Sequence, residues 1–264
     1  MFPPARLDCL ARDPSPGMRV VTTVLVYLIQ FLSLSRAFNQ EESTLASESG
    51  IHIEAIVSND FQENTYVAHL PGRSECLIVD PGLEPMKIIE YLDRHGLVPA
   101  AILNTHGHMD HVAGNKAIKA RWPGCRLVIG TDDAGKLTNP RSNLSAVFGV
   151  PVTSPPADVM VNDKDAYSAA GIDLEVLAIP GHSAGHVVYV WKAGCPVIAF
   201  VGDVIFSGSI GRTDFPDGDF TALAAGIRGK LYTLPDDTIL YSGHGPATTV
   251  GQEKRHNPFV RAEP

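Results

Sequence analysis

The stretch "NTHGHMDHVAGN", residues 104–115, places three histidines and an aspartate within six consecutive positions. It continues directly from "PAAIL", residues 99–103, an apolar run with the length of a buried strand. Imidazole and carboxylate groups are ligands that suit zinc, iron and manganese. The stretch therefore indicates a metal site in a loop at the end of a strand, with the candidate ligands His106, His108, Asp110 and His111.

Three further apolar runs each end in a residue that can bind a metal, with glycine beside it. They are "PGHSAGH" (180–186) with His182, "VGDVIF" (201–206) with Asp203, and "SGHGP" (242–246) with His244. Glycine permits tight turns and a close approach of the backbone at such positions. A lone histidine is usually an ordinary surface or core residue, but four strand ends that share one chemistry are unlikely to arise by chance.

From Ile51 onward the chain alternates strand-like and helix-like segments, and its second half repeats the character of the first. Strands are predicted over 51–58, 64–70, 75–82, 99–105, 126–130, 172–182, 187–194, 196–206 and 238–245. Helices are predicted over 84–96, 114–124 and 219–234, with a short last helix from 247, whereas 138–160 has the composition of a loop. In the first helix, Met86, Ile89 and Leu92 are expected to form the apolar side and Gly96 to end it. We expect two sheets packed face to face, helices outside, and a site along one shared edge.

The first fifty residues differ from the remainder. Residues 20–35, "VVTTVLVYLIQFLSLS", carry no charge, but they are shorter than the roughly 20 residues of a membrane span. They match the apolar region of a signal peptide, and Ser35-Arg36-Ala37 is a passable cleavage site. We expect residues 1–50 to be a targeting leader and disordered linker, and 51–264 the functional domain without a stable membrane span. The alternatives for this segment are a structural helix or a wrongly assigned start. A leader suggests the secretory pathway or an organelle as the location of the protein, and without a leader we expect the cytoplasm.

Composition excludes some classes of function. The net charge of −8, without a basic stripe, argues against nucleic-acid binding, which depends on Lys and Arg displacing counterions. The four cysteines are too few and too scattered for a disulfide scaffold, and Cys76 and Cys195 are expected to be small buried residues. The oligomeric state is left open.

The motifs THxHxDH, GHSxGH, GD and GHG, in this order, resemble the metallo-β-lactamase superfamily, and in particular its short glyoxalase II-like (hydroxyacylglutathione hydrolase-like) branch. The resemblance covers Ile51 to the C-terminus. It implies an α/β fold, a four-layer αββα sandwich, and two divalent metal ions, zinc first and iron or manganese as alternatives. It also implies a first metal held by His106, His108 and His182, and a second held by Asp110, His111 and His244, with Asp203 bridging the two.

Such a site would hydrolyse a thioester. Two metals can bridge a water and lower its pKa toward neutrality, which gives hydroxide at physiological pH. Asp110 is the candidate catalytic residue, because besides binding metal it could orient that hydroxide. A thioester fits because its leaving thiol, with a pKa of about 8.5, needs little help from an acid. The small-molecule substrate implied by the resemblance is S-lactoylglutathione or a related hydroxyacylglutathione.

The stretch "GSIGRTDFPDGD", 208–219, resembles one shared by the short glyoxalase II-like enzymes and the persulfide dioxygenases. Arg212 and Asp214 are expected to form a buried pair behind the metal ligands, the alternative being an exposed ion pair in a surface turn. His186 either supports the ligands or merely packs.

Other functions remain as alternatives. A mononuclear-iron persulfide dioxygenase shares the first motif, but the last histidine motif supplies a second metal site. A β-lactamase would not be expected to have the bridging Asp203, and a nuclease would need a basic surface. A binding module without catalysis would be expected to lack a ligand. The extra C-terminal helical region with which full-length glyoxalase II binds glutathione is not recognisable, so the mode of glutathione binding is left open.

Overall fold

The computed structural model describes residues 50–262. The predicted leader and linker, residues 1–50, lie outside this range except for Gly50, so the interpretation of that segment stays a prediction. None of the helices within residues 50–262 is both long and apolar enough to cross a membrane. Cys76 and Cys125 are buried free thiols, whereas Cys195 is an exposed one, so the prediction that Cys195 is buried was wrong.

Two six-stranded mixed sheets form the centre of the described chain, and each half of the sequence builds one of them. The first sheet contains, in spatial order, β1 (His52–Val57), β2 (Asn64–His69), β3 (Glu75–Val79), β4 (Val98–Leu103), β5 (Arg126–Gly130) and β6 (Val159–Val161). The second contains, in spatial order, β14 (Thr248–Thr249), β13 (Ile239–Ser242), β10 (Ile198–Gly202), β9 (Val187–Trp191), β8 (Ile172–Ala178) and β7 (Ala166–Ala169). A separate two-stranded ribbon pairs β11 (Ile205–Phe206) with β12 (Ser209–Ile210).

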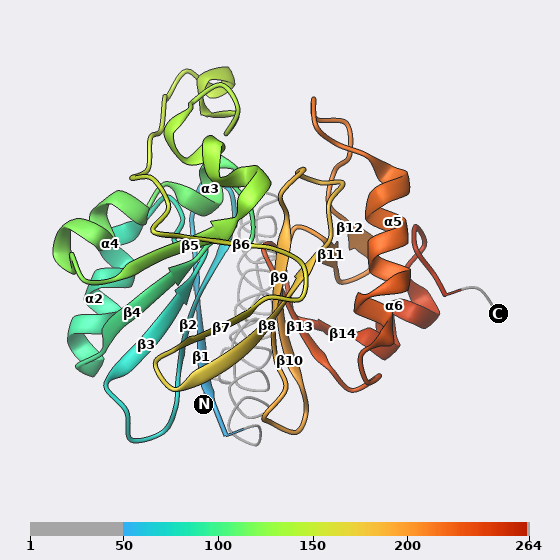
Figure 1. Ribbon diagram of the computed structural model, residues 1–264, viewed down its shortest axis with the longest axis horizontal. Coiled ribbons are helices and arrows are strands. Elements are labelled where there is room, and N and C mark those ends of the chain that lie inside the picture. Colours follow the sequence, from blue (N-terminus) through green and yellow to red (C-terminus); the bar gives the residue numbers. More distant parts are fainter. Residues whose placement is uncertain (1–49, 263–264) are drawn as a thin grey trace, which may run out of the picture. The chain divides into compact units, whose positions relative to one another are not determined.

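Three apolar cores define four layers (Figure 1). The central core lies between the sheets, where Tyr66 of the first sheet contacts Phe200 and Tyr241 of the second. The outer face of the first sheet packs against α2 (Pro85–His95) and α4 (Asn115–Arg121), and that of the second against α5 (Phe220–Gly229) and α6 (Val250–His256). The predicted αββα sandwich is therefore confirmed.

Helix α2 begins and ends where proline and glycine dictate. Pro85 occupies its first turn, where no amide hydrogen is needed, and Gly96 adopts the left-handed conformation (φ 65°) that closes it. Ile88 and Leu92 are its buried residues, whereas Met86 is exposed, so the predicted apolar side was wrong by part of a turn.

Residues 131–160, between the sheets in sequence, contain the 3-10 turns η1 (Thr131–Thr138) and η2 (Ser145–Phe148). The predicted loop over 138–160 is thus confirmed for most of its length, and β6 begins only at its end. The remaining short elements are α3 (Met109–Val112) and η3 (Leu231–Thr233).

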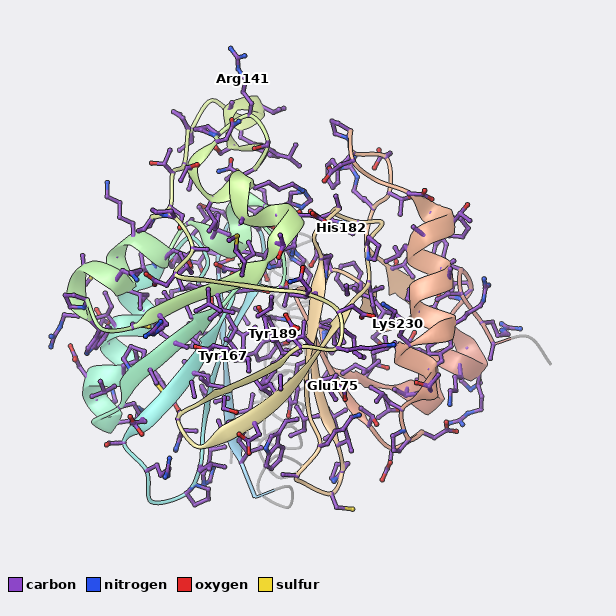
Figure 2. All side chains as sticks on the ribbon, viewed as in Figure 1. Arg141, Tyr167, Glu175, His182, Tyr189 and Lys230 are labelled. Atoms are coloured by element: carbon purple, nitrogen blue, oxygen red, sulfur yellow. The ribbon has the colours of Figure 1, made fainter. Side chains whose placement is uncertain are left out.

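The carboxyl ends of β4, β8, β10 and β13 meet at one edge of the sandwich, and hydrogen bonds join the two sheets there. The amide of Val187 donates to the carbonyl of Thr105 at 2.8 Å, and the Tyr189 hydroxyl donates to the carbonyl of Asn104 at 3.0 Å. Figure 2 shows Tyr189 between the sheets and His182 nearer the edge. The predicted shared edge is therefore present, and one backbone and one side-chain hydrogen bond fix its two halves to each other.

Candidate metal centre

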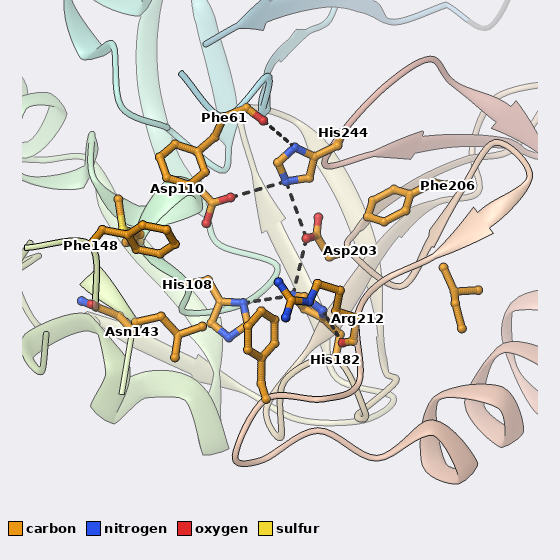
Figure 3. A pocket seen from close by; sticks show the side chains of 14 residues that line it. Phe61, His108, Asp110, Asn143, Phe148, His182, Asp203, Phe206, Arg212 and His244 are labelled. Carbon is orange, nitrogen blue, oxygen red and sulfur yellow. Dashed lines mark hydrogen bonds and ion pairs between the residues drawn. The ribbon is translucent and has the colours of Figure 1, made fainter. Parts of the chain in front are cut away.

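The loops after β4 and β8 supply the first group of candidate ligands. His106 and His108 follow β4, and His182 follows β8. Nε2 of His182 lies 3.2 Å from Nε2 of His106. The same atom lies 2.9 Å from Nδ1 of His108, a contact drawn in Figure 3. The three rings are buried, and three convergent imidazole nitrogens form a cradle for one transition-metal ion.

Helix α3 and the loop after β13 supply a second group. Asp110 and His111 belong to α3, and His244 follows β13. Oδ2 of Asp110 lies 3.6 Å from Nε2 of His111 and 3.4 Å from Nε2 of His244. These three ligand atoms lie within 4.8 Å of one another, a second cradle of nitrogen and oxygen donors.

The carboxylate of Asp203, at the end of β10, faces both groups. Its Oδ2 lies 3.4 Å from Nε2 of His182 and 3.6 Å from Nε2 of His244, and its Oδ1 lies 3.5 Å from Nε2 of His111. The structure thus brings all seven predicted ligands together, with Asp203 in the position of a bridge.

Oxygen atoms behind His106 and His111 fix the orientation of both rings. The Thr105 hydroxyl donates to Oδ2 of Asp80 at 2.7 Å, so it accepts from Nδ1 of His106 at 3.1 Å. Asp80 also accepts from the Thr105 amide and from Nδ1 of His111. Both oxygens of Asp80 are therefore occupied, and it orients His111 instead of binding a metal, although it clusters with His106 and His111.

Backbone carbonyls fix the other two rings in the same way. Nδ1 of His182 donates to the carbonyl of Arg212 at 2.9 Å, and Nδ1 of His244 donates to the carbonyl of Phe61 at 3.1 Å. In all four cases the acceptor behind the ring holds a proton on Nδ1, so that Nε2, which points into the site, is the nitrogen able to bind a metal. This pattern is typical of metal-binding histidines, in which the second nitrogen bonds a fixed acceptor.

Three buried polar atoms of the candidate ligands have no hydrogen-bond partner, namely Nε2 of His108, Nε2 of His111 and Oδ1 of Asp203. Burying a polar atom without a partner costs its full desolvation free energy. The donor set also suits borderline divalent cations. The residues present therefore fit metal ions.

His186 supports the centre but does not face it. Its Nε2 accepts from the amide of Asp203 at 3.1 Å, and its ring stacks on His106 with a centroid separation of 4.7 Å. Because this lone pair is used, His186 is not a ligand through Nε2. Of the two predicted alternatives, the supporting role is the one that the contacts favour.

Asp133 in η1 joins the two loops of the first group, a role that the sequence did not reveal. Its buried carboxylate accepts from the amide of Gly107 at 2.7 Å, the amide of Gly185 at 2.8 Å and the hydroxyl of Ser183. Lys136 lies 3.2 Å from the same carboxylate and also contacts the Ser183 hydroxyl. One buried charge thus holds the His106–His108 loop against the His182 loop.

The expected buried pair of Arg212 and Asp214 is at the surface. The two side chains form a bidentate ion pair at 2.9 and 2.8 Å, but they are 69% and 67% exposed. The prediction of burial was therefore wrong, because residues 211–218 form a surface turn in which the charged ends remain in water. Arg212 supports the centre through its backbone carbonyl instead.

The histidines of the centre differ in protonation. Burial lowers the pKa of His106 well below its usual value and that of His108 to about 2, so both rings are neutral and able to bind metal. Burial also acts to lower the pKa of His111, but the carboxylates of Asp110, Asp203 and Asp80 raise it well above its usual value. Without a metal the three carboxylates are thus compensated by a proton on His111, and a divalent cation would take over that compensation.

Comparisons with known proteins agree with this geometry. The sequence model described as the metallo-beta-lactamase superfamily matches residues 58–244. Hydroxyacylglutathione hydrolase GloC of Haemophilus influenzae is 36% identical over 81% of this chain and 100% of its own length. The crystal structure of BLEG-1 B3 metallo-beta-lactamase is 38% identical, with a TM-score of 0.75, and the match covers 79% of this chain and 99% of that one. The structure of TTHA1623 in a di-iron-bound form is 33% identical, with a TM-score of 0.69 and coverage of 78% and 100%.

The superfamily match spans more than half of the sequence and includes every candidate ligand, and the αββα sandwich carries these ligands at one edge. The chain therefore belongs to the metallo-β-lactamase superfamily.

Proposed function

We propose that this metallo-hydrolase is binuclear and cleaves a thioester, with S-lactoylglutathione or a related hydroxyacylglutathione as the first candidate substrate. The observation that carries the proposal is the carboxylate of Asp203, which lies within 3.6 Å of ligand nitrogens in both groups. The relative named hydroxyacylglutathione hydrolase GloC supports the choice of substrate.

Bound divalent ions would supply Lewis-acid activation of a water and of the substrate carbonyl. The chain's own part is to fix where these groups meet. Burial acts to raise the pKa of Asp110, but His111 and a hydrogen bond from His244 hold it below the usual value. Asp110 is therefore ionised at neutral pH and lines the cavity, where it can accept a hydrogen bond from the attacking water and orient it.

Metal analysis together with a thiol-release assay tests this function. Purified protein loaded with Zn²⁺, Fe²⁺ or Mn²⁺ is expected to contain two metal ions per chain and to release glutathione from S-lactoylglutathione. Fully loaded protein that releases no thiol from any thioester would contradict the proposed reaction. One iron per chain with oxygen uptake on a persulfide would instead identify the dioxygenase.

A second candidate is β-lactam hydrolysis, because a solved structure at 38% identity is titled a B3 metallo-beta-lactamase. The same loaded protein is therefore assayed with a chromogenic β-lactam. Higher kcat/KM on the β-lactam than on every thioester would reverse the order of the two candidates.

We also propose that the leader within residues 1–50 directs the protein to the secretory pathway or an organelle and is removed there after Ala37. N-terminal sequencing of the protein purified from its native cells is expected to find a start near residue 38. An intact Met1 in cytoplasmic protein would contradict this.

A further inference from the structure

The candidate metal centre opens into a cavity of about 340 Å³ whose walls are apolar. Beyond the metal ligands, the cavity is lined by seven apolar side chains and by only two polar ones among the described residues. This composition bears on the substrate of the proposed function, because a wall without polar partners favours an apolar group over a charged one.

One wall is built around an aromatic pair. The rings of Phe61 and Phe148 meet edge to face with centroids 5.4 Å apart, and Met109 and Leu144 also line the cavity. Leu144 has a left-handed backbone (φ 68°), a conformation that is costly for a residue other than glycine. Strain of this kind persists only where the surrounding structure holds it, and here it lies in the loop that carries Phe148.

The opposite wall lies against the metal ligands themselves. Phe215 packs edge to face on His108 and His182, at 5.0 and 5.5 Å between centroids, and Phe206 packs on His244 at 5.9 Å. Figure 3 shows Phe61 and Phe148 on one side of the ligands and Phe206 on the other. A substrate carbonyl at the ligands would therefore have apolar rings on both sides.

The two polar lining residues have their bonds satisfied elsewhere. The amide group of Asn143 donates to the carbonyl of Val152 and accepts from the amide of Ser145. Arg212 carries the only Lys or Arg charge among the described lining residues, and it is paired bidentately with Asp214 while its guanidinium lies over Phe215. No uncommitted cation in the described lining is available for the two carboxylates of glutathione.

Apolar surface continues outward from the cavity mouth. Val147 and Val150, which flank the 57%-exposed Phe148, are themselves exposed. Exposed large apolar side chains that gather beside a cavity are typical of a surface that a ligand covers. A lactoyl group, whose only apolar part is one methyl, offers little surface for such a rim to cover.

We propose that the cavity binds an apolar group of the thioester that is larger than lactoyl, an aliphatic chain or an aromatic ring, and that Phe148 determines this preference. This inference rests on the proposed thioester hydrolysis. The apolar group can belong to the acyl part or to the thiol part of the thioester, and an experiment distinguishes these two possibilities.

Two substrate series distinguish these sources. The first joins acetyl, butanoyl, hexanoyl and octanoyl groups to glutathione, and the second joins the lactoyl group to ethane-, butane- and hexanethiol. Leaving-group pKa hardly changes within a series, so differences report binding. We expect kcat/KM to rise about fourfold per methylene in one series, the amount that burial of a methylene contributes. Constant or falling values in both series would overturn the proposal.

The Phe148→Ala variant tests the named residue. It is expected to lower kcat/KM for the longest preferred substrate about tenfold and for the acetyl or ethanethiol ester less than twofold. Phe259→Ala is the matched control, because Phe259 is 50% exposed and does not line the cavity. Equal losses of kcat/KM on short and long substrates would mean that Phe148 has a structural role, and would overturn the proposal that it determines substrate preference.

Failure of this inference is distinguishable from failure of the proposed function. If all thioesters are hydrolysed at rates that do not depend on chain length, the preference for an apolar group is rejected and the proposed reaction stands. Absence of hydrolysis in the presence of two bound metals rejects the reaction itself.

Discussion

Oδ1 of Asp203 lies 3.5 Å from Nε2 of His111, and both atoms are buried without a hydrogen-bond partner. Two such atoms would ordinarily be brought together by a hydrogen bond at a shorter distance. Their separation leaves room for a cation that both would bind. Since Oδ2 of the same carboxylate faces His182 and His244, one side chain couples the two ligand groups.

Asp203→Asn is therefore expected to disturb both groups at once. The amide removes the negative charge and places donors where ligands are needed, so metal content should fall from two ions to one or fewer. Hydrolysis should fall at least about a hundredfold. Elemental analysis and circular dichroism separate metal loss from unfolding, and Asp237→Asn, at an exposed position, serves as the control. Full metal content in the variant would refute the bridging role.

Gly243→Ala tests how closely the backbone approaches the same carboxylate. A Cβ at this position would lie 2.3 Å from Oδ1 of Asp203 and 2.7 Å from Cε1 of His111. Neither group can move without losing its place in the centre, so the alanine variant is expected to lose metal. Gly124→Ala, where a Cβ has no atom within 4 Å, should retain it. Equal metal content in the two variants would show that the centre adapts.

Asp133→Ala tests the link between the two loops of the first group. It leaves the amides of Gly107 and Gly185 and the buried Lys136 short of an acceptor, so we expect a loss of about 3 kcal/mol in the free energy of unfolding. Metal affinity should fall about 10–100-fold, as for other residues behind metal ligands. Denaturant titration of metal-free protein and chelator competition measure the two effects. The neighbouring exposed Asp132→Ala is the control, and equal behaviour of the two variants would contradict the role of Asp133.

The sequence predicted which candidate ligands would cluster at the shared edge better than it predicted the residues behind them. His106 and Asp203 stand out because a metal-binding residue type at the end of an apolar run, with glycine nearby, recurs at four places in the chain. Asp80 also follows an apolar run, in "LIVDPG", but a single aspartate before Pro-Gly is equally typical of a turn. Only its contacts with Thr105 and His111 separate the two interpretations.

Burial was the property that sequence predicted least well. The pairing of Arg212 with Asp214 is local, whereas their exposure depends on how residues 211–218 lie against the rest of the domain. The same holds for Asp133, whose partners are 26 to 52 residues away in sequence. Long-range packing decides such cases, and no local pattern encodes it.

Glu63 gives a prediction for the pH dependence of stability. Its carboxyl group is buried without a hydrogen-bond partner, and burial raises its pKa well above the usual 4.5. Folded metal-free protein therefore holds a proton here that the unfolded chain releases above about pH 5. Because the folded state binds more protons in that range, the contribution of Glu63 to stability falls as pH rises, by about 1.4 kcal/mol per pH unit until the raised pKa is reached.

Glu63→Gln removes this titration and leaves a side chain of similar size. The difference in unfolding free energy between the variant and the unchanged protein should therefore shift in favour of the variant between about pH 5 and pH 7. Denaturant titrations of both metal-free proteins at several pH values measure it. Glutamine also adds a pH-independent offset, so the slope of the difference is the quantity that decides. A difference that does not change with pH would show that the Glu63 carboxylate is ionised in the folded protein and is stabilised there by a hydrogen-bond donor or a cation.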